Sequence, residues 1–164
     1  MLTDVTEIIN KQGPIISVED SSFIEIYSVW NKHLWPGRVS KIEITSCVQF
    51  GGGFNLEYLQ RPAWFWKIMV DNKLAGVNSG FLTEPKSFRS RGLYVFPEYR
   101  RLGFGRQLLL ETILKAKSLG CNHFWSMPRK SVLPTYESVG LSRCGDFFCK
   151  GVEFGPNCFA ELIL

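Results

Sequence analysis

Three arginines and two glycines lie close together in the segment YRRLGFGRQLLL, residues 99–110. The glycines, Gly103 and Gly105, stand where a polar stretch gives way to the leucine-rich pattern of a helix. A helix N-terminus presents unpaired N–H groups and a partial positive charge, and glycine lets a ligand approach the backbone closely. Arginine side chains add charge-assisted contacts to an anion. The segment therefore predicts a pyrophosphate site, with a plain turn before a surface helix as the alternative.

Two common nucleotide-binding patterns do not fit this segment. The P-loop pattern Gly-x-x-x-x-Gly-Lys-Ser/Thr is absent. The dinucleotide pattern Gly-x-Gly-x-x-Gly fails because Leu108 occupies the place of the third glycine. The strands expected before the segment also form hairpins rather than the start of a parallel βαβ unit. ATP and NAD are therefore disfavoured as the ligand.

The hydrophobic pattern predicts the elements that would position this site. Strands are expected at 15–18, 63–70, 74–83, 91–96, 122–127, 142–150 and 158–164, and helices at 21–35, 103–119 and 131–140. Residues 71–73 and 84–90 are expected to be turns, and Gly51 to Gly53 a loop. Hairpins followed by a strand–helix–strand crossover indicate an α/β (α+β) fold with a mixed, mostly antiparallel sheet flanked by helices. We expect residues 1–164 to form a single domain.

Composition limits the compartment and the partners. Nineteen Lys and Arg against fifteen Asp and Glu give a net charge of +4, which suits an anionic small ligand and disfavours nucleic-acid binding. No apolar run is long enough for a membrane helix, and the N-terminus lacks the pattern of a secretion signal. Five scattered cysteines without a Cys-x-x-Cys pair indicate a reducing, cytoplasmic location, and two histidines give no metal site.

The stretch LYVFPEYRRLGFG, residues 93–105, carries an Arg-x-x-Gly-x-Gly motif directly after an apolar strand and a proline. In this context the sequence resembles the GNAT superfamily, the GCN5-related N-acetyltransferases. The resemblance covers residues 64–143, about half of the chain, and includes YESVGL at 136–141, which is similar to the family's Tyr-Glu-x-x-Gly-Phe segment. It implies a GNAT-type single domain and acetyl-CoA as cosubstrate, with no metal.

The resemblance also implies a function and a set of site residues. An acetyl group would move from acetyl-CoA to a primary amine by direct attack through a tetrahedral intermediate. Tyr136 would protonate the departing thiolate, although a buried tyrosine of the core is the alternative. The cofactor would be held by the strand residues Leu93, Tyr94 and Val95 and by the loop residues Arg100, Arg101, Leu102, Gly103, Phe104, Gly105 and Arg106.

Several positions depart from the family pattern. Arg129 stands seven residues before Tyr136, where the family often has an asparagine. Arg89 and Arg91 stand on the strand before the motif, where some members place a catalytic carboxylate, and Glu84 acting through water is the weak substitute. His33 is expected at the surface near a helix end, with an acceptor-site role as the alternative.

These departures leave alternatives to the acetyltransferase open. They are an inert CoA-binding regulatory module and a transferase that uses a longer acyl-CoA. The partner is expected to be a small-molecule or peptide amine, with no nucleic acid and no membrane. A homodimer stays open because the C-terminal segment 158–164 is apolar.

Overall fold

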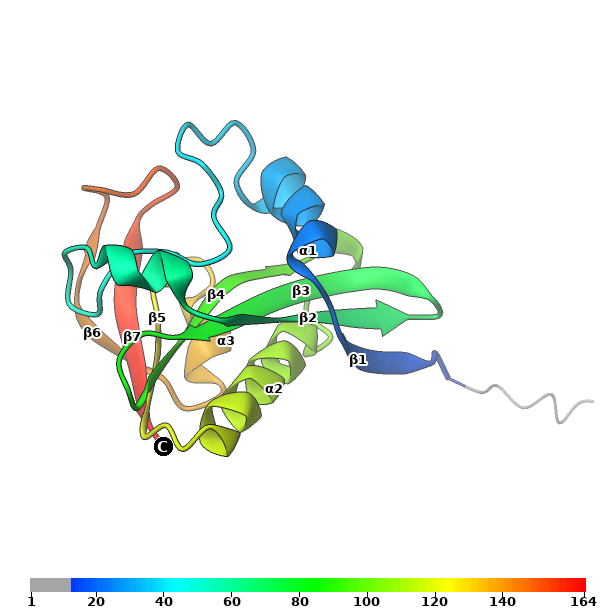
Figure 1. Ribbon diagram of the computed structural model, residues 1–164. Helices are drawn as coiled ribbons and strands as arrows, with labels where there is room; N and C mark the ends of the chain where they lie inside the picture. Colours follow the sequence, from blue (N-terminus) through cyan, green and yellow to red (C-terminus); the bar gives the residue numbers. More distant parts are fainter. Residues whose placement is uncertain (1–12) are drawn as a thin grey trace, which may run out of the picture.

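The computed structural model describes residues 13–164, which are built around a single seven-stranded sheet (Figure 1). The predicted absence of a secretion signal concerns residues that lie mostly outside this range. The strand order is β1-β2-β3-β4-β5-β7-β6. The strands are β1 (Ile16–Asp20), β2 (Ala63–Val70), β3 (Lys73–Leu82), β4 (Ser87–Val95), β5 (His123–Ser126), β6 (Ser142–Phe148) and β7 (Asn157–Ile163).

One pair of neighbouring strands is parallel, and the others are antiparallel. The pair is β4 and β5, which align only over Ser87–Arg89 and His123–Trp125. Strands β1 to β4 pair antiparallel in sequence order, and β7 pairs antiparallel with both β5 and β6. The predicted mixed, mostly antiparallel sheet is therefore confirmed. Beyond Arg89 the edge of β4 that faces β5 is not paired with it.

Helices cover both faces of the sheet. The helical segments are α1 (Phe23–Val29), the π-helix η1 (Trp30–Leu34), the 3₁₀ helices η2 (Leu56–Gln60) and η3 (Pro97–Tyr99), α2 (Phe104–Ser118) and α3 (Leu133–Glu137). Figure 1 shows α2 beneath the sheet and α1 above it. The larger buried cluster joins α2 to the sheet through Leu108, Leu109 and Phe88, and the smaller joins Ile26 and Trp30 to Val77 on the other face. No helix of residues 13–164 has the length and apolar character needed to cross a membrane.

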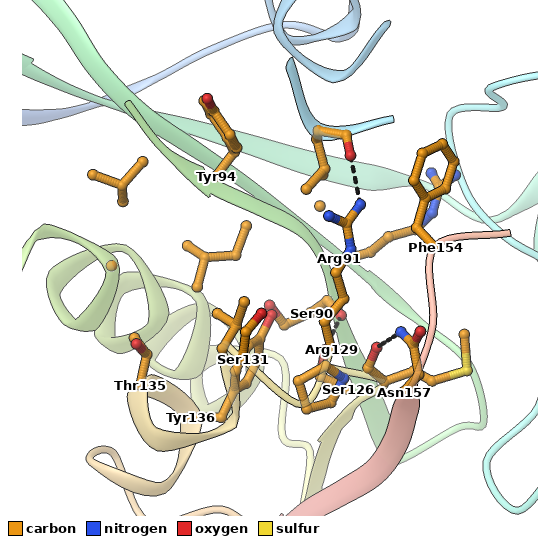
Figure 2. A pocket seen from close by; sticks show the side chains of 18 of the residues that line it. Ser90, Arg91, Tyr94, Ser126, Arg129, Ser131, Thr135, Tyr136, Phe154 and Asn157 are labelled. Carbon is orange, nitrogen blue, oxygen red and sulfur yellow. Dashed lines mark hydrogen bonds between the residues drawn. The ribbon is translucent and has the colours of Figure 1, made fainter. Parts of the chain in front are cut away.

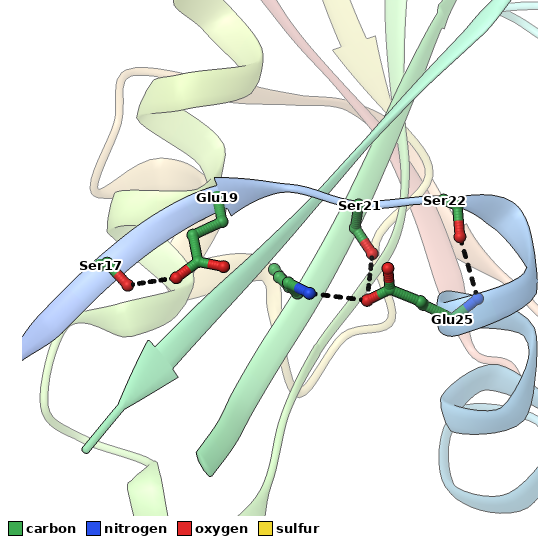
Figure 3. Close-up of polar contacts among 6 residues, drawn as sticks. Ser17, Glu19, Ser21, Ser22 and Glu25 are labelled. Atoms are coloured by element: carbon green, nitrogen blue, oxygen red, sulfur yellow. Dashed lines mark hydrogen bonds and ion pairs between the residues drawn. The ribbon is translucent and has the colours of Figure 1, made fainter. Parts of the chain in front are cut away.

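Polar contacts fix the start of α1 against the sheet (Figure 3). The Ser22 hydroxyl caps the helix by accepting a hydrogen bond from the Glu25 amide at 3.3 Å. The Glu25 carboxylate in turn accepts from Lys67 of β2 at 2.8 Å. The predicted helix at 21–35 is present, but its second half is the π-helix η1, which ends at Leu34 with Trp35 as its C-cap before Pro36.

The predicted turn at 84–90 is too long. Strand β4 already begins at Ser87, and the chain reverses over Glu84 to Lys86. Ser87, Arg89 and Ser90 at the end of this segment are buried, and the Asn78 amide of β3 donates to the Ser90 hydroxyl at 2.9 Å. Pairing with β3 therefore overrides the local sequence preference.

Candidate active site

A cleft of about 910 Å³ opens where β4 and β5 diverge. It is lined by β4, the start of α2, the segment from β5 to α3, η1 and the loop between β6 and β7 (Figure 2). Parallel strands that separate in this way expose backbone groups that a ligand can pair with. The cleft is therefore the candidate site.

The start of α2 offers unpaired amides at one end of the cleft. Gly103 is the N-cap, at φ +81°, and no side chain caps the helix. The first bond of the helix runs from the Gln107 amide to the Gly103 carbonyl, so the amides of Phe104 to Arg106 have no intrahelical partner. The helix dipole adds partial positive charge at this point. A pyrophosphate fits this arrangement.

The absence of a side chain at Gly105 leaves a narrow space in front of the N-terminus of α2. A Cβ atom at Gly105 would lie 3.1 Å from Cγ2 of Thr135, 3.7 Å from Cγ2 of Val95 and 3.8 Å from Cδ2 of Leu93. Each of these three residues lines the cleft. A longer side chain at position 105 would therefore enter the space between α2, β4 and α3.

A bulge in β4 turns its next residues into the cleft. The register with β3 shifts between Val77 and Ser79, opposite Gly92, which has φ +80°. A Cβ at Gly92 would lie 2.3 Å from the Trp30 ring, and the Trp30 indole donates to the Gly92 carbonyl at 2.8 Å. Only glycine permits both this backbone geometry and this close packing.

Tyr136 lies on the opposite side of the cleft, on α3. Its ring is buried in the larger core cluster, and Figure 2 shows its hydroxyl beside Ser90 of β4. Burial raises the pKa of the phenol, while the nearby hydroxyls of Ser126 and Ser90 and the charge of Arg89 oppose the rise. A phenol with a raised pKa stays protonated near neutral pH and can donate a proton.

Comparisons with known proteins agree with this geometry. The model of the Acetyltransferase (GNAT) family matches residues 24–141, which is more than half of the chain. The chain belongs to this family. No curated protein sequence matches it.

Solved acetyltransferases have the same fold as this GNAT chain. An acetyltransferase from Bacillus subtilis in complex with CoA is 21% identical, with a TM-score of 0.61, over 93% of this chain and 99% of that one. A GNAT-family acetyltransferase from Staphylococcus aureus is 14% identical, with a TM-score of 0.62, over 90% and 98%. The ribosomal-protein-S18-alanine N-acetyltransferase from Escherichia coli is 15% identical, with a TM-score of 0.62, over 91% and 94%. At these identities the likeness establishes the fold.

Most of the predicted site residues meet in the cleft of this GNAT domain. Tyr136 lines it, together with nine of the ten predicted cofactor residues. The tenth, Leu102, does not line the cleft, and its side chain is largely exposed. On β4, Leu93 and Val95 pack toward α2 while Tyr94 packs toward α1, so these residues present mainly backbone to a ligand. The Val95 carbonyl accepts from Nε of Arg100 at 2.8 Å and keeps a second lone pair.

The candidate proton acceptors differ in how they lie relative to the cleft, and His33 is exposed near the end of η1, as predicted. Glu84 lies outside the cleft, in the turn before β4, where it accepts a hydrogen bond from Tyr58. His33 lines the cleft, with its ring stacked 5.8 Å from that of Tyr94. Glu153 is the one carboxylate among the described residues that line the cleft. Sequence reasoning missed Glu153, because it lies in an irregular loop far from the motif.

Glu153 connects two loops through hydrogen bonds and is therefore not available as a base. Its carboxylate accepts from the Ser40 hydroxyl at 2.6 Å, the Val39 amide at 2.8 Å and the Ser40 amide at 3.0 Å. The Ser40 hydroxyl first, and then the two amides, lower the pKa of Glu153 to about 2. A carboxylate of that pKa is a weak proton acceptor near pH 7.

Arg129, which stands where the family often has an asparagine, connects η1 to the loop between β6 and β7 at one side of the cleft. Its guanidinium donates to the Leu34 carbonyl at the end of η1 and lies 5.1 Å from the centre of the Phe154 ring. Among residues 13–164, no three His, Cys, Asp or Glu side chains gather closely enough to hold a metal ion.

Proposed function

We propose that this GNAT protein transfers an acetyl group from acetyl-CoA to a primary amine. The observation that carries the proposal is a single cleft with the uncapped N-terminus of α2 at one end and a buried phenol, Tyr136, on its wall. The first feature suits a pyrophosphate, and the second suits a leaving thiolate.

The chain's own groups can hold acetyl-CoA along β4. The amides of Phe104 to Arg106 receive the pyrophosphate, and Arg101 and Arg106 add positive charge beside them. The β4 edge beyond Arg89, unpaired with β5, receives the pantetheine arm through backbone groups of Leu93 to Val95. The bound cosubstrate supplies an activated acetyl thioester.

The transfer balances with two proton movements. The nitrogen lone pair of a neutral amine forms a C–N bond to the thioester carbonyl carbon, and the C–S bond then breaks. The phenol of Tyr136 gives its proton to the departing sulfur. The proton of the new ammonium group leaves through the His33 imidazole, because Glu153 is already committed to three donors.

Other features of the chain extend the proposal. The acceptor is a small-molecule or peptide amine, and the protein works in the cytoplasm, which suits five cysteines that are all free. The homodimer remains a prediction. The apolar segment that suggested it forms β7, which lies inside the sheet between β5 and β6.

Titration calorimetry with acetyl-CoA tests the proposal, with NAD and ATP as controls. We expect micromolar binding of acetyl-CoA alone. Gly105→Glu should weaken it at least tenfold, because the new carboxylate enters the cleft beside the pyrophosphate site. Gln107→Glu is the matched control, since Gln107 is exposed, lies in the same helical turn and does not line the cleft.

An amine panel with thiol release as readout then separates the functions. Turnover of acetyl-CoA supports the transferase, and faster turnover of a longer acyl-CoA would replace the acetyl group in the proposal. Binding of acetyl-CoA without turnover on any amine would favour the inert CoA-binding module. Absence of acetyl-CoA binding would overturn the cofactor site itself.

A further inference from the structure

Two arginines of β4, Arg89 and Arg91, are buried in the wall of the cleft. Each is 5% exposed, and both line the cavity. Residues two apart on a strand project from the same face, so the two guanidinium groups share one side of β4. Charged side chains are rarely buried to this extent unless they are paired. The question is therefore which anion pairs with these two arginines.

Arg89 has no carboxylate partner among residues 13–164. Its Nε and Nη1 atoms are buried and donate no hydrogen bond to any described residue. The guanidinium lies 4.9 Å from the centre of the Trp125 ring and 6.0 Å from that of Phe81. These rings stabilise the charge through its face but leave the N–H donors along its edge unpaired. A buried donor without an acceptor is costly, so an anion that reaches these N–H groups would stabilise the folded protein.

Arg91 is fixed by its neighbours, but only some of its N–H donors have a hydrogen-bond partner. Its guanidinium lies 5.0 Å from the centres of both the Trp30 and Trp35 rings. Nη1 donates to the Glu43 carbonyl at 2.8 Å. That bond uses one of the five donors of the side chain. The rest of the group is a rigid cation on the wall of the cleft.

The positive charges of Arg38, Arg89 and Arg91 act on one another at this point. Burial lowers the pKa of Arg89 to about 10, with the charge of Arg38 as a smaller cause. Burial also lowers the pKa of Arg91 well below its usual value, helped by the charges of Arg89 and Arg38. Arg89, with a pKa of about 10, stays charged at pH 7, and arginine side chains in general stay protonated in proteins. Glu153 is the one carboxylate among the described residues of the cleft lining, and it already accepts hydrogen bonds from Val39 and Ser40.

This cationic site is distinct from the pyrophosphate site. Arg89 lies at the closed end of the cleft, where β4 still pairs with β5, and Val95 lies at the other end beside α2. They are six positions apart on β4, which corresponds to at most roughly 20 Å because the strand bulges at Gly92. The charge of Arg89 acts on Tyr136 from the other face of β4, because Arg89 and Ser90, which lies beside the phenol, project from opposite faces of the strand.

We propose that Arg89 and Arg91 bind an oxyanion of the acceptor, so that the substrate is an amine that also carries a carboxylate or a phosphate. The proposal rests on the acetyltransferase function proposed above. A guanidinium binds either anion through paired N–H donors. Polyamines, aminoglycosides and lysine-rich peptides fit this site poorly, because seven arginines line the cleft against one carboxylate among the described residues.

Matched pairs of amines test the proposal on the wild-type protein. Phenylalanine is compared with phenethylamine, and glycine with methylamine, for the carboxylate. O-phosphoethanolamine is compared with ethanolamine for the phosphate. We expect the anionic member of at least one pair to have a kcat/KM about 10- to 150-fold higher, as hydrogen bonds to a charged group allow. The pair with the larger ratio identifies which oxyanion is used.

Variants then tie the preference to the arginines. Arg89→Gln should remove most of the preference and leave acetyl-CoA affinity within about threefold. Arg143→Gln, at an exposed arginine outside the cleft, removes the same charge and should leave both unchanged. Calorimetry also measures binding of the preferred acceptor to the CoA-loaded protein, and this measurement does not depend on turnover.

The outcomes separate this proposal from the proposed function. Loss of acetyl-CoA binding in the wild type would overturn the function. Three results would overturn the anion site alone, each with normal acetyl-CoA binding. They are equal rates within every pair of amines, a polyamine as the best acceptor, and no binding of any anionic amine. If Arg89→Gln does not fold, the wild-type pairs still decide the question.

Discussion

At the scale of single residues, the cleft contains a buried phenol and buried guanidinium groups that solvent does not screen. Tyr136 and Arg89 are both almost fully buried, and each alters the pKa of the other. Electrostatic interactions are stronger in such surroundings than at the surface. The same burial that keeps the phenol protonated therefore makes an unpaired arginine a strong anion receptor.

Replacing Tyr136 with phenylalanine removes the proton donor and keeps the buried ring. We expect kcat to fall by about two orders of magnitude, which is the lower range for loss of a general acid, with acetyl-CoA affinity nearly unchanged. Because burial raises the pKa of the phenol above its usual 10, this group should cause no loss of wild-type rate up to about pH 9. Steady-state rates from pH 6 to 9, with calorimetry, provide the check. An unchanged kcat would mean that the ring only packs.

At the scale of elements, the sequence identifies the apolar elements well and the loops around the cleft poorly. The motif at 99–110 predicts the helix start, and α2 begins at Phe104, one residue from the expected start. Arg89 and Arg91 alternate on an apolar strand, a pattern that could have signalled buried charge. The partners of Ser90 and Glu153 could not be predicted, because they come from segments 12 to more than 100 residues away.

Glu153 joins the loop after η1 to the loop between β6 and β7, and this link should depend on pH. Its folded-state pKa, about 2, is below the usual 4.5, so the stabilisation is complete above pH 4.5 and is lost as the pH falls toward 2. Glu153→Gln should therefore unfold at a lower urea concentration than the wild type at pH 7 and 5, with a smaller difference at pH 3.

Urea unfolding followed by fluorescence at the three pH values measures this difference. Glu98→Gln, at an exposed carboxylate of η3, is the control for removing a surface charge. A difference between wild type and Glu153→Gln that grows from pH 5 to pH 3 would contradict the assigned role of the three hydrogen bonds.

At the scale of the whole molecule, the cleft divides the sheet into two parts that share a short seam. Strands β1 to β4 form one part and β5 to β7 the other, and the seam is the parallel pairing of Ser87–Arg89 with His123–Trp125. Beyond the seam, the Ser126 hydroxyl donates to the Ser90 carbonyl at 2.8 Å. A ligand that lies along β4 and contacts α3 would join both parts.

Acetyl-CoA should therefore stabilise the protein as a whole and protect both walls of the cleft. At a hundred times its Kd, a ligand adds about 2.7 kcal/mol to the free energy of unfolding. For a chain of this size, that raises Tm by roughly 5 to 11 °C. Amide exchange should slow on the β4 side, in residues 90–95, and on the α3 side, in residues 126–136, with Gly105→Glu showing neither effect. Protection confined to the start of α2 would mean that the cofactor binds at the helix end without entering the cleft, and Tyr136 would then have no thioester beside it.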